Sequence, residues 1–171
     1  MKKSFGGLLL TRLLSAICLA IFTGCQTDAV YHSYKPTGAD GWRQEDTLSF
    51  RLPTTITGRH YMLEIGVKHT VIYPYKDLWV EIRNEERTDS FHILLTDSLN
   101  QWAGNGMASS SYQFVTEPIN YYLSESDTLL HVNHLMSDTL LGGVTDIGIR
   151  LSFAGGIDAQ KHEQQDGEAP Q

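Results

Sequence analysis

The sequence predicts an all-β protein, an antiparallel β-sandwich of about eight strands, and three observations support this prediction. Apolar residues alternate with polar ones through most of residues 46–153, which is the period of strands that bury one face. Clusters of Gly, Pro, Asn, Asp and Ser separate these runs. No part of this region shows a long apolar repeat of 3.6 residues. A closed barrel and a mixed α+β domain are the alternatives to the sandwich.

The first 24 residues have the three parts of a bacterial export signal. Lys2, Lys3 and Arg12 supply positive charge, and residues 13–22 form an apolar run. This run has the length of a signal-peptide core and is shorter than the ~20 apolar residues that a transmembrane helix needs. We therefore expect residues 1–24 to be a lipoprotein signal peptide that is removed on export.

The tetrapeptide at residues 22–25 resembles the bacterial lipobox, in which a diacylglycerol is attached to a cysteine before cleavage. Phe22 stands where leucine is usual. Cys25 is accordingly the predicted lipidation site and the first mature residue, and an ordinary signal that leaves a free Cys25 is the alternative. Because Cys18 lies in the removed segment, the exported domain would have no disulfide and would depend on its core alone.

Export makes the charge of the chain more one-sided. The signal contains three of the 13 basic residues and none of the 20 acidic ones, so its removal takes the net charge from −7 to about −10. An acidic surface repels phosphate backbones and anionic lipids, so we expect no nucleic-acid partner. Membrane attachment is assigned to the lipid on Cys25 rather than to electrostatics.

The mature chain divides into a lipidated lead or tether at residues 25–45, a β-sandwich domain at residues 46–153 and a tail at residues 154–171. The lead could contain a short edge strand at residues 30–34. The tail has too few apolar residues to offset its ordering entropy, so disorder is expected. Residues 138–141 could form one helical turn at most. The alternating runs predict strands at residues 48–52, 61–67, 78–82, 91–95, 112–114, 119–123, 128–134 and 147–153.

Two motifs resemble ligand sites but lack what the chemistry needs. Residues 104–106 begin a glycine-rich phosphate pattern, yet Ser109 replaces the third glycine and no helix is expected after it. A loop that needs positive φ is the better interpretation. His131 and His134 would point to opposite faces of a strand, so one metal ion could not bind both.

The remaining candidates for chemistry are equally incomplete. Residues 97–100 resemble the start of a calcium loop, but Leu99 occupies a position that needs an oxygen ligand. A looser calcium site remains open. No G-x-S-x-G motif is present to place a nucleophilic serine. We therefore predict no catalytic residues, no metal site, no cofactor and no enzymatic activity.

Aromatic residues are the best candidates for binding. Trp79 is expected on the polar face of its strand, where a ring among charged side chains can anchor a protein or stack on a sugar. Packing under a loop is the alternative. Trp102 could close the end of the sandwich or lead a binding loop. We assign Tyr75, Trp79 and Trp102 as candidate partner contacts and add Trp42 as a candidate for sugar stacking.

Several short motifs follow the cysteine in a definite order. They are Val30-Tyr31-His32-Ser33-Tyr34, Gly41-Trp42, Asp46-Thr47-Leu48-Ser49-Phe50, Tyr73 to Val80, Gln101 to Met107, His134-Leu135-Met136 and Leu140 to Arg150. This order resembles the gliding-motility lipoprotein H family (GldH) of the Bacteroidetes over nearly all of residues 25–153. The resemblance implies a non-enzymatic cell-envelope lipoprotein linked to gliding motility and to type IX secretion, and it brings no catalytic residues.

Two functions follow from these observations. The first is an interaction module, held at the outer membrane by the lipid on Cys25, that binds envelope proteins of the gliding or secretion machinery. Residues 26–29 contain one acid rather than the acidic run of surface-export signals, which favours the periplasmic face. The alternative is a glycan- or peptidoglycan-binding lipoprotein that stacks sugars on Trp42, Trp79 or Trp102.

Overall fold

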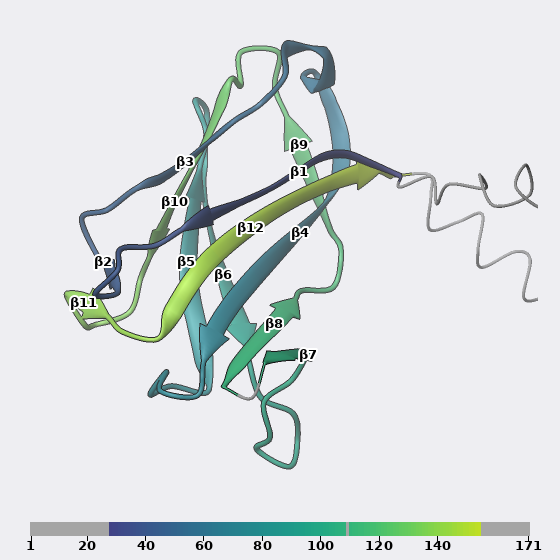
Figure 1. The fold of residues 1–171 in the computed structure, drawn as a ribbon. Helices are drawn as coiled ribbons and strands as arrows, with labels where there is room; N and C mark the ends of the chain where they lie inside the picture. Colours follow the sequence, from purple (N-terminus) through teal and green to yellow (C-terminus); the bar gives the residue numbers. More distant parts are fainter. Residues whose placement is uncertain (1–27, 109, 155–171) are drawn as a thin grey trace, which may run out of the picture.

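The structure is a computed structural model that describes residues 28–108 and 110–154. The predicted export signal, Cys25 and all but the first residue of the predicted tail lie outside the described residues. Two antiparallel β-sheets pack face to face, and a two-stranded ribbon lies beside one end of them (Figure 1). Within the described residues, no helix has the length and apolar character needed to cross a membrane.

The larger sheet has six strands in the order β1-β12-β4-β8-β7, and β9 also pairs with β4. Its strands are β1 (Ala29–Pro36), β4 (Arg59–Thr70), β7 (Asn105–Ala108), β8 (Ser111–Val115), β9 (Ile119–Leu123) and β12 (Val144–Phe153). The smaller sheet has the order β3-β10-β5-β6. Its strands are β3 (Leu48–Arg51), β5 (Asp77–Arg83), β6 (Thr88–Leu94) and β10 (Leu129–His134).

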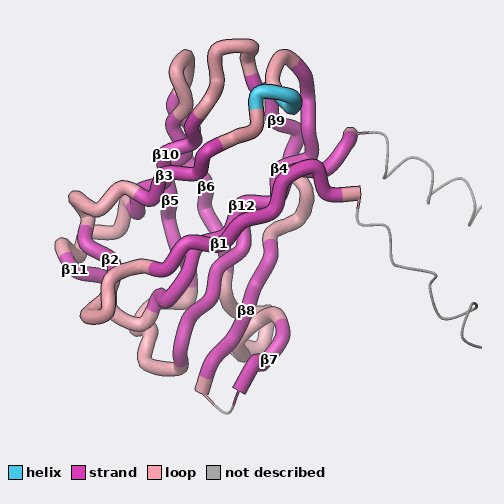
Figure 2. Tube along the Cα trace, turned by 45° about the horizontal axis from the view of Figure 1, so that its top comes forward, coloured by secondary structure: helices cyan, strands magenta, loops and turns pink. Residues whose placement is uncertain are grey.

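The ribbon consists of β2 (Trp42–Arg43) and β11 (Leu140–Leu141), which pair with each other. A 3-10 turn, η1 (Thr54–Ile56), is the helical element of the described residues, and strands make up most of the rest (Figure 2). The ribbon packs Trp42 and Leu141 into the core, whereas Leu140 is exposed. It therefore closes one end of the space between the sheets.

The core lies between the two sheets and is built from alternate strand positions. On β4, Leu63, Ile65 and Val67 face inward, and Leu78 and Val80 do so on β5. Each such side chain, fully buried, contributes ~1.5–3 kcal/mol of hydrophobic stabilisation. Neither cysteine lies within the described domain, so the burial of these side chains, rather than a disulfide, stabilises it.

The structure confirms the all-β class, and each of the eight predicted strands is present. The possible edge strand at residues 30–34 is also present, as β1 paired along β12. Three strands were missed, since the described chain has twelve. Two of these, β2 and β11, have two residues each, which is too short to show a period. Residues 138–141, which were considered able to form one helical turn at most, form none, and Leu140 and Leu141 pair with β2 instead.

Candidate protein-binding surface

Trp79 stands on the outer face of β5, as its place in the alternating pattern predicts. Its neighbours Leu78 and Val80 are fully buried, whereas the Trp79 side chain is 41% exposed. His92 lies directly opposite on β6, and the two rings stack with centroids 4.3 Å apart and planes 11° apart. The His92 Nε2 atom is 2.7 Å from a carboxylate oxygen of Asp77. These contacts hold the exposed indole in one orientation.

An apolar groove of about 300 Å³ adjoins this stack. It lies where β6 of the smaller sheet comes beside β8 and the segment that leads to β9, and His92 lines it. Its apolar lining is provided mainly by Phe91, Leu94, Phe114 and Ile119. Leu94 is 60% exposed, although it is a large aliphatic side chain. Because His92 belongs to both the stack and the groove, the two form one continuous surface.

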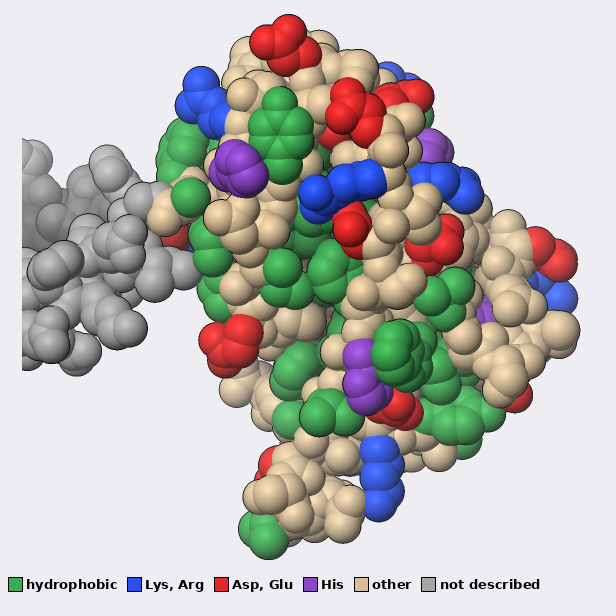
Figure 3. Space-filling model, turned by 180° about the vertical axis from the view of Figure 1, so that it is seen from behind, with side chains coloured by type: hydrophobic (Ala, Val, Ile, Leu, Met, Phe, Trp, Pro, Cys, Tyr) green, Lys and Arg blue, Asp and Glu red, His purple; other side chains and the backbone are tan. Residues whose placement is uncertain are grey.

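We call this surface the edge surface and define it by Trp79, Phe91, His92, Leu94, Phe114 and Ile119. Seen from behind, hydrophobic side chains gather around a histidine on this side of the molecule (Figure 3). Within the described chain, β6 pairs with β5 alone, so its other edge offers free backbone N–H and C=O groups. Lysine and proline commonly protect such edges, and residues 88–94 contain neither. A partner strand could therefore pair with β6 and cover the groove.

Tyr75 and Trp102 lie in an aromatic cluster away from the stack. The Tyr75 hydroxyl donates to a carboxylate oxygen of Asp138 at 2.8 Å, and its ring meets the Tyr73 ring edge-on at 5.8 Å. Trp102 is partly buried, with its ring 4.5 Å from that of His69 and 6.5 Å from that of Tyr73. This packing supports the reading of Trp102 as an end plug. A role of either residue in partner contact stays a prediction.

Trp42 cannot act as a sugar platform, so that expectation is wrong. The side chain is 0% exposed, and its Nε1 donates to the backbone oxygen of Asp46 at 2.8 Å. Its ring meets His134 edge-on at 5.2 Å. The surrounding segment is rich in turn residues, and only the pairing of β2 with β11 reveals that it covers the core.

The two strand histidines have opposite orientations, as predicted. His134 is buried, and burial lowers its pKa. His131 faces outward, and its Nδ1 lies 2.9 Å from the Ser49 hydroxyl. The sequence could not reveal this Ser–His pair because β3 and β10 are far apart in the chain. A nucleophilic serine also needs a base that a third group orients, and no carboxylate of the described residues forms a hydrogen bond with His131.

The two loop motifs, residues 104–106 and residues 97–100, form turns rather than ligand sites. Gly104 has φ +89°, which confirms the predicted need for positive φ, but residues 105–108 then form β7 instead of a longer loop. The Asp97 carboxylate accepts from the backbone N–H groups of Leu99 and Gln101, closing its own turn. Within the part of the chain that the structure describes, no group of three or more His, Cys, Asp or Glu side chains could hold a metal ion.

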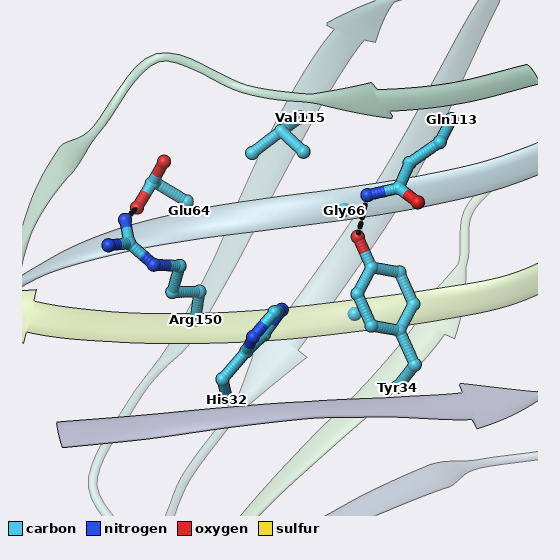
Figure 4. Close-up of a pocket in the computed structure, with 8 residues that line it drawn as sticks. His32, Tyr34, Glu64, Gly66, Gln113, Val115 and Arg150 are labelled. Carbon is cyan, nitrogen blue, oxygen red and sulfur yellow. Dashed lines mark hydrogen bonds and ion pairs between the residues drawn. The ribbon is translucent and has the colours of Figure 1, made fainter. Parts of the chain in front are cut away.

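A second hollow, of about 290 Å³, lies on the outer face of the larger sheet (Figure 4). Gly66 and Gly148 are opposite each other on β4 and β12, and the ring of Tyr34 from β1 packs on both. The Gln113 amide donates to the Tyr34 hydroxyl at 3.2 Å. Arg150 forms an ion pair with Glu64 beside them. Because the Tyr34 hydroxyl, the Gln113 amide, Arg150 and Glu64 already have protein partners, we interpret the hollow mainly as the place where β1 is held on the sheet.

The sequence signal for the edge surface was incomplete. The alternating pattern placed Phe91 and Phe114 in strands, and both were expected to face the core. Leu94 shares the outward face of β6 with His92, so its exposure could have been found from the same pattern. The groove itself could not have been found from this pattern, because it depends on which strand lies at the edge of each sheet.

Comparisons with known proteins give a consistent result. The profile of a family described as GldH lipoprotein matches residues 29–151. The gliding motility lipoprotein GldH of Flavobacterium johnsoniae is 22% identical over 153 residues, which cover 81% of this chain and 92% of that protein. No solved structure matches the chain.

Proposed function

Because the chain belongs to the GldH lipoprotein family, we propose that it is a non-enzymatic cell-envelope lipoprotein that supports gliding motility or the associated type IX secretion. In this proposal it acts as an interaction module, and the edge surface binds another envelope protein. A lipid on Cys25 holds the module at the outer membrane, facing the periplasm. The relative from Flavobacterium johnsoniae is named for gliding motility. This name supports a role in gliding motility, but it does not identify the protein that the edge surface binds.

The observation that carries the proposal is the continuity of the exposed Trp79 ring with the apolar groove beside β6. Large aromatic side chains with fixed orientation lose little entropy on binding and dominate the energetics of protein interfaces. The free edge of β6 adds backbone groups that a partner strand can use. An envelope protein with an exposed or extended apolar segment fits this surface.

The experiment is co-purification of the tagged full-length chain from its own envelope, comparing two matched double variants. Trp79→Ser/Leu94→Ser removes two exposed apolar side chains from the edge surface. Ile72→Ser/Leu99→Ser removes two exposed apolar side chains elsewhere. We expect a gliding or secretion component to be recovered with the wild type and the Ile72/Leu99 variant, and lost with the Trp79/Leu94 variant.

Each variant is informative only if its thermal midpoint matches that of the wild type. Truncation of an aromatic anchor commonly costs ~2 kcal/mol or more of binding free energy, which is enough to remove a partner of micromolar affinity from the eluate. Equal recovery with both variants would reject the edge surface. Recovery of no envelope protein, with abundant wild-type bait, would reject the interaction module.

Glycan binding is the second candidate, and the exposure of Trp79 favours it. One face of the indole stacks on His92, which leaves the opposite face as the candidate platform for a sugar ring. Sedimentation with purified peptidoglycan tests this directly. Binding that Trp79→Ser abolishes would support the glycan function, and no sedimentation of the wild type would exclude peptidoglycan as the ligand.

A further inference from the structure

The proposed lipid site and the folded domain lie close together along the chain. Strand β1 begins at Ala29, so three residues separate it from Cys25. Four fully extended Cα–Cα steps span at most ~14 Å. The headgroup region on each side of a bilayer is roughly 5–8 Å deep. A lipid on Cys25 would therefore hold the start of β1 at or just above the headgroups.

The available tether is shorter still because Asp28 is bound to the domain. Its carboxylate lies 2.5 Å from the guanidinium of Arg150 on β12, and Arg150 also forms an ion pair with Glu64 on β4. Only Gln26 and Thr27 then separate Cys25 from a residue that is paired with β12. From Cys25 to Asp28 the chain can reach ~11 Å at most.

The margin of the larger sheet nearest this point carries exposed aromatic side chains. Strand β1 starts where β12 ends (Figures 1 and 2), with Ala29 opposite Ser152. Phe153, the last residue of β12, is 50% exposed. Across β4, His60 pairs with Tyr122 of β9, and Tyr122 is 38% exposed.

We define Phe153, His60 and Tyr122 as the anchor-side patch. The rings of His60 and Tyr122 lie 5.0 Å apart, and that of Phe153 lies 6.0 Å from Tyr61. Strands are spaced ~4.8 Å apart, so the three steps from β1 to β9 cover only about 15 Å. Along the strands, the register places Ala29 level with Ser152 of β12 and with Met62 of β4, which is two residues from His60. The patch therefore lies at the end of the sheet at which the lipid would hold Ala29.

The chemistry of the patch fits a membrane interface. Tyrosine and histidine carry an apolar body with a polar tip, and such rings settle at the headgroup level of a bilayer. Phe153 supplies a purely apolar ring at the same margin but on the inner side of the sheet, because it is paired with the inward-facing Tyr61. Because the mature chain as a whole is acidic, its net charge does not attract it to anionic lipid, and we assign the contact to the rings.

We propose that the anchor-side patch rests on phospholipid headgroups, so that the sandwich stands on the margin where β1 begins and β12 ends. This inference rests on the proposed lipid at Cys25. With this margin on the membrane, the opposite end of β1 lies about 23 Å away along the strand and is held away from the headgroups. The loop around Ala39 follows that far end and is exposed.

The test uses the lipidated full-length protein in vesicles of phosphatidylethanolamine and phosphatidylglycerol. Once Cys18 is removed with the signal and Cys25 is acylated, a single introduced cysteine is the sole thiol for a fluorophore. Two matched positions are Ala154→Cys, next to the patch, and Ala39→Cys, at the far end of β1. A quencher attached to the lipid headgroup reports their distance from the membrane.

We expect the label at residue 154 to be quenched several-fold more strongly than the label at residue 39. Adding Phe153→Ser/Tyr122→Ser to the Ala154→Cys protein should lower this quenching, while the protein still floats with the vesicles. Ile72→Ser/Leu99→Ser is the matched control and should leave the quenching unchanged. A thermal melt of each variant verifies that the domain remains folded.

The outcomes separate this inference from the proposed anchor. Equal quenching at the two positions on floated vesicles would overturn the orientation and leave the lipid on Cys25 intact. Quenching unchanged by Phe153→Ser/Tyr122→Ser would show that the tether alone sets the distance, and would overturn the patch. Failure of the wild type to float would overturn the anchor on Cys25 and this inference with it.

Discussion

At the scale of single residues, a missing side chain at Gly148 lets the edge strand β1 attach to the larger sheet. A Cβ atom on Gly148 would lie 2.5 Å from ring carbons of Tyr34, which is closer than packed atoms come. The Tyr34 ring also covers Gly66. The Lys68 ammonium, on the same face of the sheet as Gly66, lies 4.4 Å from the centroid of the Tyr34 ring. The contact between Tyr34 and Gly148 therefore joins two of the motifs on which the family resemblance rests, residues 30–34 and residues 140–150.

We predict that Gly148→Ala lowers the free energy of unfolding by ~1–3 kcal/mol, because the Tyr34 ring must move to admit the methyl group. Gly142→Ala is the matched control, since a Cβ there meets no atom within 4 Å, and its effect should stay within ~0.5 kcal/mol. Urea unfolding of both variants measures the difference. If Tyr34 is the cause, the cost of Gly148→Ala should shrink in a Tyr34→Ser background. Equal stabilities of the two alanine variants would contradict this account.

Two buried histidines give the fold a dependence on pH. Burial lowers the pKa of His69 and of His134, and each has one ring nitrogen without a partner in the described chain. As pH falls, the unfolded chain, with histidine pKa near 6.5, takes up protons first. The stability that these neutral rings contribute is therefore complete above pH ~6.5 and is lost below it.

We predict that the thermal midpoint falls between pH 7.5 and pH 5.5, with at most ~1.4 kcal/mol of stability lost per pH unit for each histidine. The variant His69→Gln/His134→Gln should show a shallower decline, even if it is less stable at pH 7.5. The control is His32→Gln/His131→Gln, whose rings are on outer faces. An unchanged slope in the first variant would show that other groups cause the pH dependence.

At the scale of strands, position within each sheet decides local stability. Strand β4 has β12 on one side and β8 with β9 on the other, whereas β6 and β7 each have one partner in the described chain. Central strands open only when the whole domain unfolds, and edge strands open locally. The strand that borders the edge surface is thus also one of the easier strands to remodel for a partner.

We predict that amide hydrogen exchange is slowest at Leu63, Ile65 and Val67 of β4 and faster by orders of magnitude in β6 and β7. Exchange measured by NMR on the soluble domain, residue by residue, tests this order. Protection of β6 equal to that of β4 would mean that a second chain or another segment covers its free edge.

Alternation in the sequence was sufficient to predict eight strands of the two sheets and the outward face of Trp79, because period two is a local property. It could not predict β2 and β11, because two-residue strands are defined only by their pairing partner. For the same reason Trp42, in a turn-rich segment, was expected to be available to a sugar and is buried instead.

At the scale of the whole molecule, the sheet order that places β6 at an edge is a long-range property that no local pattern encodes. The sequence identified Trp79 as a binding candidate, but its continuity with Leu94 and Phe114 depends on how the two sheets pack. The short distance in sequence from Cys25 to β1 likewise acquired meaning only when Ala29 was found to begin a paired strand. The proposed anchor and the proposed binding surface together would make a module that stands at a membrane and offers one edge to a partner.

The most direct test of this account is photo-crosslinking in the living envelope. A photoreactive phenylalanine analogue replaces Leu94 on the edge surface or, as the control, the exposed Ile72. The account predicts a crosslink from position 94, and not from position 72, to a component of the gliding or type IX secretion machinery. A crosslink to such a component from position 72 alone, or from neither position while the lipoprotein is abundant in the envelope, would contradict it.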